Sequence, residues 1–168
     1  MMKALLYIFL FMIMAAGCTN PFAPAENKDA PGSQLLGDQS TVEGLFQNFR
    51  YAYLFKDTLI YGRLLADDFN FIYTDYEEGI DKSWGRQEDV LATSRMFGAT
   101  QNIDLVWNNF AIAEVDTNIR EISRQFILTV RFNPNDVVQV NGRVNMILRR
   151  QYPDADWKIE RWRDESNF

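Results

Sequence analysis

Apolar and polar side chains alternate along much of the second half of the chain, and this alternation constrains the fold more than any other feature. One run contains Phe126, Leu128, Val130 and Phe132, and a second contains Val138, Val140, Val144, Met146 and Leu148. Successive side chains of a β-strand point to opposite faces, so each run predicts a strand with one buried face. Residues 133–136 between the runs are Asn-Pro-Asn-Asp, which predicts a turn and therefore an antiparallel hairpin.

Shorter segments extend the predicted sheet on both sides of this hairpin. Ile103, Leu105 and Trp107 alternate in the same way, and Trp157, Ile159 and Trp162 mark a last strand after a turn at residues 152–154. An earlier strand is expected at residues 69–73, followed by a polar loop that continues to Gly85. Gly142 is expected to mark a β-bulge in the long second run.

Helical spacing dominates the first half of the domain. Apolar residues recur at steps of three and four from Val42 to Phe55, and Ser40 with Glu43 predicts a capping box at the start of this helix. A short second helix is expected from Leu59 to an end near Asp67-Asp68, and a third over residues 86–97 with Gly98 as its stop. Helices followed by a run of antiparallel strands predict an α+β domain in which the helices cover one face of a curved sheet.

The order of the predicted elements resembles the nuclear transport factor 2-like family. Local features agree with this resemblance, including the aromatic first helix, the segment 67–71 that leads into a strand, and Trp157-Lys158-Ile159 near the chain end. The resemblance implies a cone-shaped α+β roll over residues 40–168, with three N-terminal helices packed on a curved, mainly antiparallel sheet. The family includes steroid isomerases, polyketide cyclases and domains without catalytic activity, so the fold alone does not assign a function.

The N-terminus has the layout of a bacterial lipoprotein precursor. Lys3 precedes an apolar run over residues 4–16, which is shorter than the roughly 20 residues of a membrane-spanning helix. Residues 15–18, Ala-Ala-Gly-Cys, resemble the lipobox, in which the cysteine is lipidated and becomes the new N-terminus. Cys18 is the only cysteine of the chain, and lipidation would account for an unpaired thiol in an exported protein.

This layout predicts three segments: a signal peptide over residues 1–17, a lipidated flexible tether over residues 18–39 and the domain from residue 40. The tether is rich in proline and glycine and poor in large apolar residues. The expected location is the cell envelope, with attachment to the membrane through lipid on Cys18. Because Thr19 rather than aspartate follows the cysteine, the resemblance favours the outer membrane where the organism has one.

Composition excludes several classes of function. The chain has 23 acidic and 17 basic side chains, and loss of Lys3 with the signal peptide leaves a net charge of −7. An acidic chain lacks the clustered cations that nucleic-acid binding requires. The chain has no histidine, which removes the commonest acid–base group and the usual zinc ligand. The acidic loop at residues 75–81 lacks the register of a calcium-binding loop, and no metal or cofactor is expected.

Candidate ligand-binding residues are Tyr53, Arg86, Trp107 and Arg124. Tyr53 lies on the apolar face of the first helix, where it also fits a plain core role. Arg124 shares the inward parity of Phe126, so it either meets a ligand carboxylate or pairs with an internal carboxylate, and the internal pair is favoured. Arg86 has the same two interpretations. No residue is assigned a catalytic role, since no strand carboxylate points clearly inward.

Other carboxylates have simpler interpretations than catalysis. Asp67 and Asp68 are expected at a helix end and turn, and Asp104 should point to solvent because Ile103 and Leu105 flank it.

Three functions remain open. The leading one is a lipid-anchored, non-catalytic cone that binds a small apolar ligand or a protein. The second is an isomerase- or cyclase-like enzyme that uses an aspartate and a tyrosine in the cone, where burial raises the carboxyl pKa. The third is a structural module that forms a homodimer through its sheet face. An open cavity with a buried carboxylate near Tyr53 would favour the enzyme, whereas a filled cone would exclude it.

Overall fold

The computed structural model describes residues 35–165, without the side chains of residues 109 and 110, and it confirms the α+β fold class. Three helices are present in this part: α2 (Val42–Phe55), α3 (Thr58–Leu64) and α4 (Arg86–Ala99). The strands are β1 (Leu65–Asp75), β2 (Ile80–Gly85), β3 (Asn102–Asp116), β4 (Ile119–Asn133), β5 (Asp136–Arg149) and β6 (Lys158–Asp164). The predicted signal peptide and most of the predicted tether lie outside the described residues.

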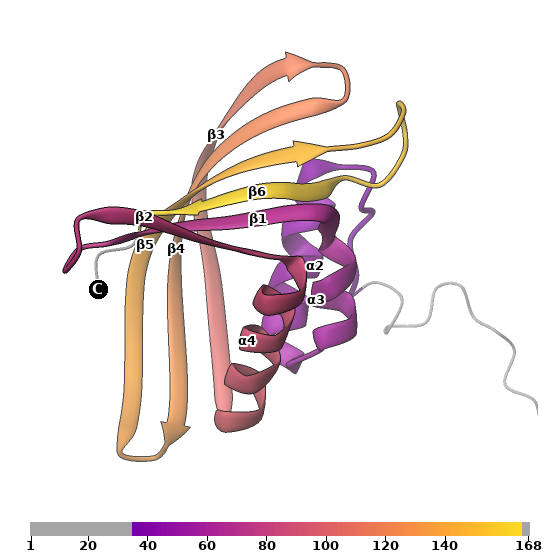
Figure 1. Cartoon of the computed structure of the whole chain (residues 1–168). Coiled ribbons are helices and arrows are strands. Elements are labelled where there is room, and N and C mark those ends of the chain that lie inside the picture. Colours follow the sequence, from indigo (N-terminus) through magenta and orange to yellow (C-terminus); the bar gives the residue numbers. More distant parts are fainter. Residues whose placement is uncertain (1–34, 166–168) are drawn as a thin grey trace, which may run out of the picture. The chain divides into compact units, whose positions relative to one another are not determined.

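The strands form one sheet in the order β2-β1-β6-β5-β4-β3. All neighbouring strands are antiparallel except β1 and β6, which are parallel, so the sheet is mainly antiparallel. Figure 1 shows the sheet curving away from flat, with the three helices on one side of it. Among the described residues, no helix is both long and apolar enough to span a membrane.

The core lies between the helices and the inner face of the sheet. Helix α2 buries Leu45, Phe46, Phe49 and Ala52, as its three- and four-residue spacing predicts. The alternating strand residues belong to the same buried core: Val144, Met146 and Leu148 are at most 2% exposed, and Asn145 and Ile147 between them are only partly buried. The two periodicities of the sequence therefore correspond to the two layers of the domain.

The start of α2 differs from the predicted capping box. The N-cap is Thr41, whose hydroxyl accepts a hydrogen bond from the Gly44 N–H at 3.0 Å. Glu43 does not reach back to the cap, because its carboxylate forms an ion pair with Arg124 of β4 at 3.3 Å. Glu43 therefore pairs with a residue that is distant in the sequence and does not take the capping role that the local motif predicts.

Three further expectations about local structure are wrong. Residues 80–85 form strand β2 and not a loop, because they pair with β1 and Trp84 stacks on Phe71 at 4.6 Å between ring centroids. Gly98 does not stop α4, which continues to Ala99. Gly142 lies in regular register opposite Phe126, without a bulge.

The segment that precedes α2 is bound to the domain. The Trp157 N–H donates to the Gln39 carbonyl at 2.9 Å, and the Gln39 side-chain amide donates to the Trp157 carbonyl at 2.9 Å. Asn48 of α2 accepts from the Gly37 N–H at 2.7 Å. Residues 37–39 are thus hydrogen-bonded to the domain, directly before the predicted start at Ser40.

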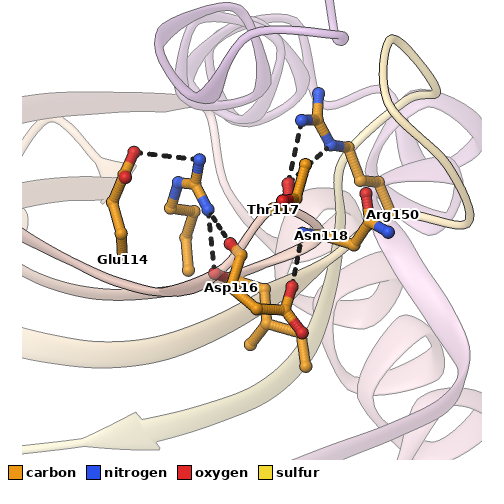
Figure 2. Close-up of polar contacts among 7 residues, drawn as sticks. Glu114, Asp116, Thr117, Asn118 and Arg150 are labelled. Atoms are coloured by element: carbon orange, nitrogen blue, oxygen red, sulfur yellow. Dashed lines mark hydrogen bonds and ion pairs between the residues drawn. The ribbon is translucent and has the colours of Figure 1, made fainter.

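The turn between β3 and β4 and the side chains near it pack around Trp157. Figure 2 shows Arg150 donating to the Thr117 carbonyl and Glu114 in an ion pair across the turn; the partner of Glu114 is Arg120, at 2.9 Å. The guanidinium groups of Arg120 and Arg150 both lie over the Trp157 ring, 5.3 and 4.6 Å from its centroid. These contacts explain the burial of Trp157 without a ligand.

Candidate functional site

A cavity of about 350 Å³ lies between the helices and the inner face of the sheet. Every helix and strand from α2 to β6 contributes to its wall. The aromatic lining residues are Phe49, Tyr53, Tyr61, Phe71, Trp84, Trp107, Phe126 and Trp162. Ala92 of α4 also lines the cavity and is exposed to solvent, so the cavity opens beside this helix. Its volume is at the lower end of the range for small-molecule sites.

Asp89 places a carboxylate in this mostly apolar wall. The residue lies in the first turn of α4 and is only 5% exposed. The Tyr61 hydroxyl of α3 donates to one carboxylate oxygen at 2.5 Å, and the Trp84 indole N–H of β2 donates to the other at 2.9 Å. Three elements that are separate in the sequence thus fix the orientation of one carboxylate.

The environment of Asp89 raises its pKa above the ordinary value of 3.8. Burial is the largest cause, because removal of water disfavours the charged form. The hydrogen bonds from Tyr61 and Trp84 act in the opposite direction, since they stabilise the carboxylate. A carboxyl group with a raised pKa in a cavity wall is suited to accept and return a proton.

The two tyrosines beside Asp89 remain protonated. Burial, with the nearby charge of Asp89, raises the pKa of both Tyr53 and Tyr61 well above the usual value of 10.0. Side-chain hydrogen bonds with Thr93 and Tyr61 partly oppose this effect at Tyr53. Both hydroxyls are therefore hydrogen-bond donors at any physiological pH. Asp89, Tyr61, Tyr53 and Thr93 form one polar strip along a mainly apolar wall.

Comparison with solved structures identifies the architecture. A candidate scytalone dehydratase from Novosphingobium aromaticivorans aligns with a TM-score of 0.66 at 12% identity, over 76% of this chain and 82% of that protein. An NTF2-like protein of unknown function in nutrient uptake from Rhodospirillum rubrum aligns with a TM-score of 0.61 at 18% identity, over 76% and 99%. The fold is nuclear transport factor 2-like.

A hexachlorocyclohexane dehydrochlorinase shares the same nuclear transport factor 2-like fold, with a TM-score of 0.60 at 10% identity, over 77% of this chain and 85% of that protein. By sequence, the chain matches no family model and no curated protein. The resemblance of the sequence pattern to this family is thus confirmed at the level of fold. Neighbours with such different names do not select a function.

Two of the four candidate ligand-binding residues line the cavity of this nuclear transport factor 2-like cone. Tyr53 and Trp107 both contribute to its wall. Arg86 does not, because its guanidinium donates to the Gly62 carbonyl at 2.7 Å and joins α4 to α3. Arg124 also lies outside the cavity lining, since it pairs with Glu43 and its guanidinium lies 4.5 Å from the Phe46 ring centroid. The favoured interpretation of Arg124 as an internal pair is confirmed.

The other carboxylates considered from the sequence lie away from the cavity. Asp67 and Asp68 are exposed in β1 and are not at a helix end; Asp68 pairs with Arg149. Asp104 points to solvent, as its parity predicts, with 59% of its side chain exposed. In the acidic loop, Asp75 pairs with Lys82 at 2.6 Å. Within residues 35–165, no group of three or more potential ligands could hold a metal ion.

Asp89 is not among the residues predicted from the sequence, although one pattern in α4 indicates it. Asp89, Thr93 and Phe97 follow each other at four-residue steps and are the buried residues of α4. Four-residue spacing places side chains on one face of a helix, so Phe97 marks a buried face that also contains a carboxylate. The apolar residues of this helix also include Leu91, which is 50% exposed, so apolar spacing alone does not mark the face that contains Asp89.

Proposed function

We propose that this domain binds a small, largely apolar molecule in the cavity and that Asp89 exchanges a proton with it. The observation that carries the proposal is the one carboxylate that is buried within residues 35–165, that of Asp89, held by Tyr61 and Trp84 in the wall of an open and mainly aromatic cavity. A cavity filled by side chains would have argued against an enzyme. The proposed reaction class is isomerisation or elimination.

The proposed step needs no co-reactant. The Asp89 carboxylate takes a proton from a carbon of the ligand, and the electron pair of that C–H bond remains on the ligand. In an isomerisation, Asp89 returns the proton to another carbon of the same molecule. In an elimination, the electron pair forms a double bond and expels a leaving group with its own bonding pair. Tyr53 would donate a hydrogen bond to negative charge that develops on the ligand.

Tyr61 and Trp84 are proposed as positioning residues, because they act through Asp89 and not on the ligand. Their two hydrogen bonds fix the carboxylate and limit the rise of its pKa. Two structural neighbours are named as a dehydratase and a dehydrochlorinase, and enzymes of both kinds catalyse eliminations. This supports the reaction class only as an analogy, since the identities of 12% and 10% carry the fold and nothing further.

The ring opening of nitrobenzisoxazole tests this proposal without knowledge of the natural substrate. A base removes the proton of its ring carbon, the N–O bond breaks, and a coloured cyanophenolate forms. The probe is small and planar, which suits the mainly aromatic wall of the cavity. We expect saturable ring opening by the purified chain that a second apolar ligand inhibits competitively. Binding of the probe without acceleration over the buffer reaction would contradict proton transfer.

A non-catalytic binding domain is the second candidate, and one observation favours it. Both carboxylate oxygens of Asp89 already accept a hydrogen bond, so Asp89 could serve only to join α3, β2 and α4. In that case the cavity would bind apolar molecules, and the ring opening would not exceed the background rate. The same experiment therefore separates the two functions.

We propose further that the domain is attached to the cell envelope through lipid on Cys18. Support comes from the sequence pattern of residues 1–18 alone. Cells supplied with labelled palmitate should incorporate the label into the natural chain and not into the Cys18→Ser variant, and the variant should leave the membrane fraction. Equal labelling of both chains would refute the anchor. The outer membrane is the expected destination where one exists.

A further inference from the structure

The charged residues of the cavity are all of one sign. In the described part of the chain, Asp89 and Asp164 line the cavity, and no lysine or arginine does. Asp164 lies on β6, two residues after Trp162, so both side chains are on the inner face of that strand. An anionic ligand would meet these two carboxylates in the lining, and the cavity therefore disfavours anions.

Aromatic rings surround these carboxylates. Trp84, which donates to Asp89, stacks on Phe71 at 4.6 Å with an interplanar angle of 17°. Phe71 in turn contacts Trp162 edge to face at 5.3 Å. A continuous series of aromatic rings thus runs from Trp84, the partner of Asp89, to Trp162, and ring faces attract cations, those of tryptophan most strongly.

A neutral ligand would neither compensate the charge of the Asp89 carboxylate nor make a cation–π contact with the rings. Burial penalises the Asp89 carboxylate, and a positive charge in the cavity would offset that penalty. Desolvation in an apolar cavity also strengthens the attraction between a cation and a ring face. Carboxylates and indole rings together are the chemistry that recognises substituted ammonium groups.

We infer that the molecule this cavity takes carries a positively charged amine or quaternary ammonium group on a small apolar body. The ammonium group lies between Asp89 and Asp164 against the rings of Trp84 and Trp162, and the apolar body fills the space beside Phe126 and Leu128. The inference rests on the proposed function for the cavity as the ligand site, and it adds the class of substrate.

Three probes of matched size test this inference by isothermal titration of the purified chain. Benzyltrimethylammonium is a cation, neopentylbenzene is its uncharged isostere, and phenylacetate is an anion. We expect the cation to bind at least about tenfold more tightly than the isostere, which corresponds to about 1.4 kcal/mol. Phenylacetate should show no binding. Equal affinity for the cation and the isostere, or tighter binding of the isostere, would overturn the inference.

Two variants test whether the preference for the cation arises in the cavity. Asp164→Asn should reduce the affinity for benzyltrimethylammonium about tenfold and leave that for neopentylbenzene unchanged. Asp104→Asn is the matched control, because it makes the same charge change at an exposed site on the outer side of β3. If Asp104→Asn lowers the affinity for benzyltrimethylammonium as much as Asp164→Asn does, the preference for the cation comes from the net charge of the protein. The inference then fails.

The binding measurement is independent of turnover. Ring opening of nitrobenzisoxazole with no preference for the cation would refute this inference and leave the proposed proton transfer intact. A preference for the cation without ring opening would refute proton transfer and leave the inference intact. Absence of binding by both the cation and its isostere would refute both, since each depends on an open cavity.

Discussion

The Asp89→Asn variant is expected to lower the rate of nitrobenzisoxazole ring opening by about 10²–10⁴-fold, the usual contribution of a positioned general base. The amide has nearly the same shape as the carboxylate but cannot accept the proton. The probe should still bind, because the aromatic wall that contacts it is unchanged. The effect should therefore appear in kcat, measured by the absorbance of the phenolate product.

The control for this prediction is Asp104→Asn, which removes a carboxylate that is 59% exposed and outside the cavity. Its kcat should equal that of the natural chain. If both variants lose activity equally, or if Asp89→Asn retains full activity, Asp89 is not the base. Circular dichroism of both variants would show that the fold is intact.

Phe49→Ala is expected to destabilise the domain by about 3–5 kcal/mol, the usual cost of deleting a buried phenyl ring. Phe49 is 1% exposed, and its ring contacts Tyr53, Tyr61, Trp107 and Trp162 at centroid distances of 4.9 to 5.5 Å. Loss of the ring would enlarge the cavity and release the two tyrosines that adjoin Asp89. Urea denaturation followed by tryptophan fluorescence measures the change.

Phe55→Ala is the matched control, because Phe55 ends the same helix but is 59% exposed. It should cost less than about 1 kcal/mol, since its ring contact with Tyr51 lies at the surface and surface substitutions have small effects. A similar loss from both variants would mean that Phe49 is not at the centre of the core.

The fold was predictable from the sequence because two periodicities separate its layers. The three- and four-residue steps of α2 and the alternation in β4 and β5 each mark one buried face. Strand β2 was not predictable in this way. Its residues are mostly exposed, and its pairing with β1 depends on contacts such as that of Trp84 with Phe71. No local pattern contains such information.

The candidate site was only half predictable, and the reason is similar. Tyr53 and Trp107 lie on elements with a clear apolar face, so their inward direction followed from spacing. Asp89 was missed because a carboxylate at the start of a helix has a simpler local explanation, namely its favourable interaction with the helix dipole. Its role depends on Tyr61 and Trp84, which lie 28 and 5 residues away in the sequence.

The pKa of Asp89 in the intact protein decides whether this carboxylate is a base that faces the cavity. Carbon-13 NMR of protein labelled at the aspartate carboxyl carbons gives this value, and the signal of Asp89 is the one absent from Asp89→Asn. We predict a midpoint above 3.8 that rises further when neutral neopentylbenzene fills the cavity, because the ligand displaces water from the carboxylate. A midpoint at or below 3.8, or one that the ligand does not move, would contradict a cavity-facing base.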